Sequence, residues 1–193
     1  MSRFNIHQVE TIRNGLDHPE CINFGADGRL YAGGFGGQVY VMKPPSWELR
    51  KLGQTEGFLL GVAADNDDNV YLCNATEHKI IRMDQKGAVS DFCQKAPDGP
   101  VILPNYGAFD ANGNYYFSDS GDYWGVNGRL IMARPDGLAI TLLANLHCPN
   151  GLAIAPRDDS IFIIESTAAA ILRIPISKAG SIETPELYAQ LQI

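Results

Sequence analysis

The sequence predicts an all-β fold, specifically a β-propeller built from four-stranded antiparallel blades. Twenty glycines and eleven prolines separate short runs of aromatic and β-branched residues, which is typical of many short strands joined by turns. A hydrophobic period of 3.6 residues persists nowhere for more than about two helical turns. The third observation is an internal repeat of about forty residues, a length typical of a propeller blade when the repeat is made of strands.

Four segments of the chain share the same order of an apolar strand, an Asp/Asn/Gly turn, a strand with an aromatic residue, a loop and a third strand. They read HPECINFGADGRLYAGGFGGQVYVM, LLGVAADNDDNVYLCNATEHKIIRM, LPNYGAFDANGNYYFSDSGDYWGVNGRLIMA and CPNGLAIAPRDDSIFIIESTAAAILRI. The second-strand aromatic residues, Tyr31, Tyr71, Tyr116 and Phe162, are 40, 45 and 46 residues apart. A fourth strand follows each segment, in WELRKLG, AVSDFCQ, AITLLAN and ELYAQL.

These segments set the expected blade boundaries within a single domain, residues 1–193. The blades are expected at approximately 16–54, 55–95, 100–145 and 147–192. Within residues 3–13, FNIHQVETI reads as a strand of a closing blade. In such a blade the first strand lies innermost and successive connections alternate between the two faces. The start of strand one and the loop between strands two and three therefore share a face.

Composition excludes several functional classes. The formal net charge is −7 and the basic residues are scattered, which argues against a nucleic-acid partner. The longest apolar runs are about five residues, far below the roughly 20 that a membrane-spanning helix needs, so no membrane partner is expected. The four cysteines are at least 20 residues apart and no signal peptide precedes them. We therefore expect reduced thiols in a cytoplasmic protein.

Three of the four repeats begin with a proline followed by a residue that carries a side-chain oxygen. These residues are Glu20, Asn105 and Asn150, and they lie 11, 11 and 12 residues before the second-strand aromatic residue. In the second repeat the equivalent residue is Leu60. We name these four the lead-in residues. Because the first strands surround the axis, three oxygen-bearing side chains are expected at the mouth of the central channel.

The chemistry of these oxygens predicts a cation site. Carboxylate and amide oxygens suit a hard cation such as Ca²⁺ better than Zn²⁺, which prefers Cys and His. Glu20, Asn105 and Asn150 are therefore the expected ligands of a divalent cation, Ca²⁺ rather than Zn²⁺. The alternative is that each residue only caps a turn, as Asn and Pro commonly do.

Three stretches resemble a known family of six-bladed propellers: HPECINFGADGRLYAGG, LPNYGAFDANGNYYFSDSG and CPNGLAIAPRDDSIFIIES. The chain is similar here to the gluconolactonase, regucalcin (senescence marker protein) and luciferin-regenerating-enzyme-like proteins. The resemblance implies that Glu20 and Asn150 bind a divalent cation, usually Ca²⁺ or Zn²⁺, together with an Asp of a later blade. It implies that Asn105 is a ligand or a substrate contact.

The activity that this resemblance implies is metal-dependent hydrolysis of small lactones or esters. The cation polarises the ester carbonyl and activates a water, while a carboxylate takes the proton. The arginine and aspartate that flank the third-blade Asn in the family are Leu103 and Tyr106 here, so Tyr106 is expected to contact the substrate. Asp119, at the end of the third repeat's second strand, is a candidate base, with a plain turn residue as the alternative.

The third repeat carries an insertion between its second and third strands. Leu130 follows Tyr116 by 14 residues, whereas Val39 follows Tyr31 by 8. The inserted loop, SGDYWGVNG, is expected on the face of the lead-in residues. Its Tyr123 and Trp124 are expected either to stack on a ligand or close over it, or to pack against a neighbouring blade.

Four blades do not close a ring of six, and the later Asp of the family would lie beyond Ile193. We therefore expect a C-terminally truncated propeller whose open strand edges favour a homodimer. The alternative function is a catalytically inactive partial propeller that binds a cation or small ligand, or acts through self-association.

Overall fold

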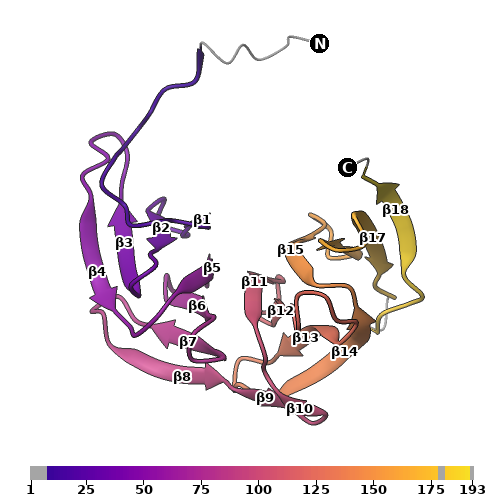
Figure 1. Ribbon diagram of the computed structural model, residues 1–193. Coiled ribbons are helices and arrows are strands. Elements are labelled where there is room, and N and C mark those ends of the chain that lie inside the picture. Colours follow the sequence, from indigo (N-terminus) through magenta and orange to yellow (C-terminus); the bar gives the residue numbers. More distant parts are fainter. Residues whose placement is uncertain (1–7, 178–180, 192–193) are drawn as a thin grey trace.

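The computed structural model describes residues 8–177 and 181–191. Within them the chain forms four four-stranded antiparallel sheets and one two-stranded hairpin, which confirms the all-β class. The sheets follow one another around an arc, with their first strands on the inside and their fourth strands on the outside (Figure 1). This is the blade arrangement of a β-propeller.

Each blade uses four consecutive strands in simple meander order. The first two blades are formed by β1 (Ile22–Phe24), β2 (Leu30–Gly33), β3 (Gln38–Met42), β4 (Arg50–Gln54), β5 (Leu59–Ala64), β6 (Val70–Asn74), β7 (Lys79–Met83) and β8 (Val89–Cys93). The other two are formed by β11 (Pro104–Phe109), β12 (Tyr115–Asp119), β13 (Gly128–Ala133), β14 (Ala139–Leu146), β15 (Pro149–Ile154), β16 (Ser160–Glu165), β17 (Ala170–Pro175) and β18 (Glu186–Gln190). Each group of four consecutive strands forms one antiparallel sheet.

Two features differ from the expectation. The hairpin β9 (Lys95–Ala96) and β10 (Gly99–Pro100) connects the second and third blades and was not expected from the repeat. The expected strand over residues 3–13 lies partly outside the described residues, and its described part, 8–13, is exposed and forms no strand. No strand of the described chain lies paired beside it to supply the hydrogen bonds that a strand requires.

The hydrophobic core lies in three clusters, one between each pair of neighbouring blades. The cluster between the second and third blades is aromatic: Tyr71 meets Phe109 with ring centroids 4.8 Å apart, and Tyr115 is completely buried beside them. The other two clusters combine aliphatic side chains with Tyr31 and Tyr116. Three of the four second-strand aromatic residues that defined the repeat, Tyr31, Tyr71 and Tyr116, therefore pack between blades.

The inner strands β5, β11 and β15 share an irregularity near their first residues. The pairing with the second strand shifts between Leu59 and Val62, between Pro104 and Gly107, and between Pro149 and Leu152. Bulges of this kind change where a side chain points. The lead-in residues Leu60, Asn105 and Asn150 all fall within these shifts, so the same backbone distortion presents each of them.

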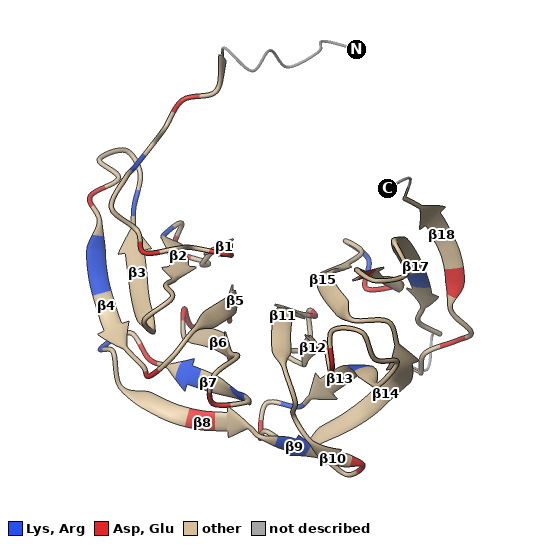
Figure 2. Ribbon diagram, in the orientation of Figure 1, with Lys and Arg blue, Asp and Glu red and all other residues tan. Residues whose placement is uncertain are grey.

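The inner strands of the arc carry no charged residues. Figure 2 shows the inner strands β1, β5, β11 and β15 without a Lys, Arg, Asp or Glu residue, whereas outer strands and turns carry both signs. Among the residues described, no helix is long and apolar enough to cross a membrane.

Candidate functional site

Asn105 is held by a hydrogen-bond chain that fixes the orientation of its amide. The Ser120 hydroxyl donates to the Pro149 carbonyl over 2.6 Å, so its oxygen is left to accept the Asn105 Nδ2 hydrogen at 3.1 Å. Because Nδ2 is the donor, Oδ1 is the atom of the amide that stays available. Ser120 thus links the start of the third blade to the start of the fourth and leaves Asn105 Oδ1 available to a ligand.

The start of the fourth blade is fixed through its backbone. The Ser118 hydroxyl donates to the Asn150 carbonyl over 2.6 Å and accepts the Tyr106 backbone N–H at 3.1 Å. Asn150 is exposed, and within the described residues no hydrogen bond holds its side chain. Its amide is therefore free to bind a ligand on the same blade junction as Asn105.

Glu20 stands before β1 and forms an ion pair with His18. The Oε1–Nε2 distance is 3.0 Å and the Glu20 side chain is 46% exposed. Around the arc, β5 lies between β1 and β11 (Figure 1). Leu60 is in β5 and Asn105 is in β11, so the blade that carries Leu60 separates the other two. No hydrogen bond or ion pair of the described residues joins the three oxygen-bearing lead-in residues directly. The described part of the chain also contains no group of three or more His, Cys, Asp or Glu side chains that could hold a metal ion.

Two thiols adjoin the lead-in residues but remain protonated. Burial raises the pKa of Cys21, next to Glu20, and of Cys148, two residues before Asn150. All four cysteines are free and buried. A protonated thiol is a poor nucleophile, so neither cysteine is a candidate nucleophile.

Asp119 has a different environment from the one that a base requires. Its side chain is completely buried and lies 2.5 Å from Arg129 Nη2. Its carboxylate also accepts the Leu103 N–H at 2.7 Å and the Ile102 N–H at 3.1 Å. These bonds hold the segment before Pro104, and with it Asn105, so the structure gives Asp119 a positioning role.

The same role recurs in two other blades, and the repeat alone did not identify it. Asn74 and Glu165 occupy the position of Asp119 at the end of the second strand, and both are buried. Asn74 donates to the Glu56 carbonyl over 2.6 Å, and Glu165 accepts the His147 N–H at 2.7 Å. The signal in the sequence is a polar residue three positions after each second-strand aromatic residue, in YLCN, YFSD and FIIE.

The aromatic residues expected at the site lie in two places. Tyr106 is half-buried and packs against the core cluster of the first and second blades and that of the third and fourth blades. Burial, followed by the nearby Cys21, raises its pKa. Tyr123 and Trp124 are 57% and 85% exposed, and their rings form an edge-to-face pair with centroids 4.7 Å apart. Since both rings are open to solvent, packing against a neighbouring blade does not account for them.

Fold and site together define a β-propeller whose oxygen donors stand at the inner starts of its blades. The chain belongs to the SMP-30/gluconolactonase/LRE-like family, because the model of that region matches residues 36–192. The N-terminal region of the strictosidine synthase-like proteins also matches, over residues 5–42. A comparison with curated protein sequences gave no significant match.

Solved structures with the same fold include two proteins related to gluconolactonases. One is a gluconolactonase from Xanthomonas campestris, with a TM-score of 0.82 and 18% identity over 94% of this chain. The other is a structural-genomics target assigned to the gluconolactonases, with a TM-score of 0.80 and 14% identity over 95% of this chain. The chain spans 65% and 68% of the lengths of these two proteins.

Proposed function

We propose that this chain is a lactonase-type hydrolase that acts on small lactones or esters with the help of a divalent cation. The observation that carries the proposal is the Ser120 hydrogen-bond chain, which leaves the Asn105 side-chain oxygen available at the start of its blade. Glu20 and Asn150 stand at the equivalent starts of two other blades, and the chain belongs to the gluconolactonase-like family. The substrate is a small molecule that contacts Asn105, Tyr106, Tyr123 and Trp124.

The donor set fits Ca²⁺ better than Zn²⁺. Glu20 supplies a carboxylate, and Asn105 and Asn150 supply amide oxygens, which are the ligands of a hard cation. The neighbouring thiols of Cys21 and Cys148 are buried, whereas the Glu20 and Asn150 side chains are exposed and offer oxygen, which suits a hard cation better than a softer metal. A bound cation would supply Lewis-acid polarisation of the lactone carbonyl.

The residues of the chain divide the remaining work. Asn105, whose amide is fixed by Ser120, and Asn150, whose backbone is fixed by Ser118, orient the substrate or cation at one blade junction. We assign to Glu20 the proton of the attacking water, since it is the carboxylate among the lead-in residues and its second oxygen is not engaged by His18. Asp119 positions Asn105 and does not take the proton.

The test is lactone hydrolysis in a pH-stat with and without chelator, together with Ca²⁺ titration by calorimetry. Activity should need the cation and fall at least about 100-fold in Glu20→Gln, the scale of a lost general base. Glu48→Gln, an exposed glutamate before the outer strand of the same blade, should leave both unchanged. Activity that is indifferent to chelator and to Glu20→Gln would contradict the proposal.

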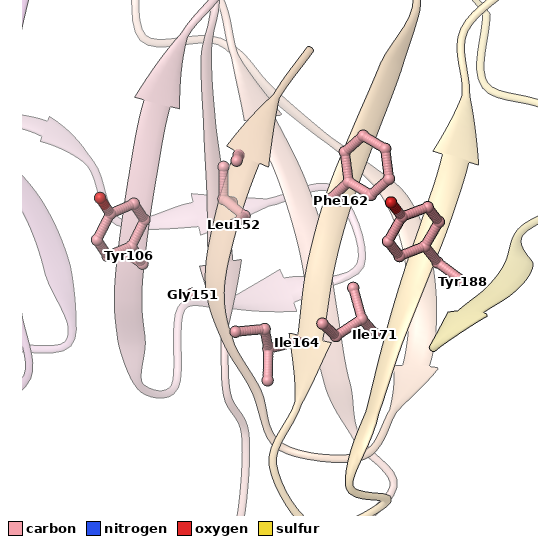
Figure 3. Close-up of a pocket in the computed structure, with 8 residues that line it drawn as sticks. Tyr106, Gly151, Leu152, Phe162, Ile164, Ile171 and Tyr188 are labelled. Carbon is pink, nitrogen blue, oxygen red and sulfur yellow. The ribbon is translucent and has the colours of Figure 1, made fainter. Parts of the chain in front are cut away.

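A second candidate function, self-association without catalysis, is favoured by the free face of the fourth blade. Phe162, Ile164, Ile171 and Tyr188 line an apolar hollow of about 520 Å³ there (Figure 3). Phe162 and Tyr188 meet edge to face with centroids 4.9 Å apart. Exposed apolar patches of this kind mark association surfaces in soluble proteins.

The repeat supports a propeller blade as the occupant of this face. The residues equivalent to Ile164 in the preceding blades each face the next blade: a Cβ on Gly33 would meet Leu59, and the Ser118 hydroxyl bonds the Asn150 carbonyl. Ile164 is 39% exposed. The occupant we propose is the first blade of a second copy, which would make a homodimer.

Solution mass tests this second candidate. A mass of twice 21 kDa that returns to the monomer in Ile164→Asp supports it, because a buried unpaired charge opposes the contact. A monomer at all concentrations, or a dimer that survives Ile164→Asp, contradicts it. The lactone assay distinguishes the two candidates, since only the first predicts turnover.

A further inference from the structure

An aromatic cluster stands beside Glu20. The rings of His18, Phe35 and Phe58 meet with centroids 5.0 to 5.9 Å apart. The same His18 ring forms the 3.0 Å pair with Glu20. The phenyl rings are therefore neighbours, through one imidazole, of the carboxylate that we place in the site.

The cluster belongs to the face of the lead-in residues and not to the core. Phe35 lies on the loop between β2 and β3, and Phe58 lies just before β5. Phe35 is 57% exposed, and neither ring belongs to the core clusters between blades. Exposed phenyl surface that is gathered at a site is typical of a ligand contact.

The backbone holds this wall in place. The Phe35 N–H donates to the Asp17 carbonyl over 3.1 Å, and the Phe58 N–H donates to the Thr76 hydroxyl over 3.0 Å. The Leu59 N–H donates to the Gly34 carbonyl over 3.2 Å, which ties the two ring-bearing segments together. A wall held in this way is preorganised, and preorganisation reduces the entropy cost of binding.

Resting on the proposed function, we propose that the substrate carries an apolar ring that packs on Phe35 and Phe58, so that the preferred class is an aryl or alkyl-substituted lactone and not a polyhydroxylated one. Hydroxyl groups placed against phenyl faces would lose hydrogen bonds to water without replacement. The lead-in residue Leu60, two residues after Phe58, is aliphatic and offers no hydrogen-bond partner to such hydroxyl groups.

Binding of two unreactive lactams tests the inference apart from catalysis. Isoindolin-1-one and 2-pyrrolidinone differ by one fused benzene ring, and calorimetry gives the ratio of their dissociation constants. We expect the aryl lactam to bind about tenfold more tightly, which corresponds to about 1.4 kcal/mol. The ratio should fall to about one in Phe35→Ala/Phe58→Ala and by about threefold in Phe35→Ala alone, an exposed position where folding is not at risk.

Phe24→Ala is the matched control. Phe24 is a phenylalanine of the same blade with similar exposure, 59%, but it lies at the opposite end of β1, so its removal should leave the ratio unchanged. A ratio near one in the wild type, a ratio that survives the double substitution, or tighter binding of glucono-δ-lactone than of phthalide would overturn the inference.

The two proposals fail separately. Hydrolysis of γ-butyrolactone and phthalide at equal kcat/KM would leave the hydrolase intact and remove the aromatic specificity. A tenfold lactam preference that depends on Phe35, without turnover of any lactone, would remove the hydrolase and leave the aromatic site.

Discussion

Replacing Asp119 by asparagine separates a positioning role from a catalytic one. The wild-type carboxylate is completely buried, pairs with Arg129 at 2.5 Å and accepts the backbone N–H groups of Ile102 and Leu103. Breaking a buried ion pair costs about 3 to 5 kcal/mol, because it leaves a buried charge unpaired. Arg129 keeps a contact with Asp98 at 3.1 Å, so we expect the low end, about 3 kcal/mol.

Urea denaturation followed by circular dichroism measures this cost. With a slope of about 2 kcal/mol per molar urea, the midpoint should fall by about 1.5 M. Asp67→Asn removes a carboxylate from an exposed turn, and its midpoint should stay within about 0.25 M of the wild type, as surface substitutions usually do.

The reasoning is refuted if Asp119→Asn keeps the wild-type midpoint within about 0.5 M. Such a result together with lost lactone hydrolysis would instead return Asp119 to the role of a base. A cycle with Arg129→Met provides an independent check. Since the two side chains touch, the double variant should be less destabilised than the sum of the single variants.

The remaining predictions concern orientation, acid stability and thiol reactivity. Ser120→Ala should release the Asn105 amide and weaken Ca²⁺ binding in calorimetry by about fivefold, the scale of one hydrogen bond; unchanged affinity would remove the orienting role. The hydrogen bond from Thr141 lowers the pKa of Asp98, so its stabilisation is present above about pH 4, the usual pKa, and is lost as pH falls through the lowered folded-state pKa. Asp98→Asn should therefore reduce the melting temperature at pH 7 but not at pH 2, and an equal reduction at both would contradict this. Since burial raises the thiol pKa of Cys21, that thiol should react with an aromatic disulfide at least about 100-fold more slowly in the folded than in the urea-unfolded protein.

The repeat was sufficient to predict the blades because their strands are set by local chemistry. Asp and Gly close the turns, and alternating apolar residues define the strands that pack between blades. The hairpin at β9 and β10 was missed because QKAPDGP reads as a plain turn. Its two-residue strands carry no hydrophobic alternation, and the pairing depends on where the third blade begins.

The sequence predicted which residues lie at the starts of the blades, but not the hydrogen bonds that hold them there. Counting back from the aromatic residues identified Glu20, Asn105 and Asn150 as equivalent, but not the Ser120 bridge, which lies 15 residues from Asn105 and 29 from Pro149. The cluster of His18 and Phe35 with Phe58 was not predicted for the same reason. It forms across a blade boundary, where contacts depend on how two sheets pack and not on the spacing within either.

The buried polar residues explain how one scaffold presents different side chains at equivalent places. In three blades, hydrogen bonds to the segment before the first strand come from a buried residue, Asn74, Asp119 or Glu165. The lead-in residue itself therefore contributes little to the stability of the fold. Leu60 and Asn150 occupy equivalent bulges in two blades although one side chain is apolar and the other polar. This agrees with a fold whose stability does not depend on the lead-in residue. Substitutions of Glu20 and Asn150, both exposed, should therefore change binding without a matching loss of stability. A loss of activity in those variants then reports on chemistry, whereas the same loss in Asp119→Asn reports on the position of Asn105.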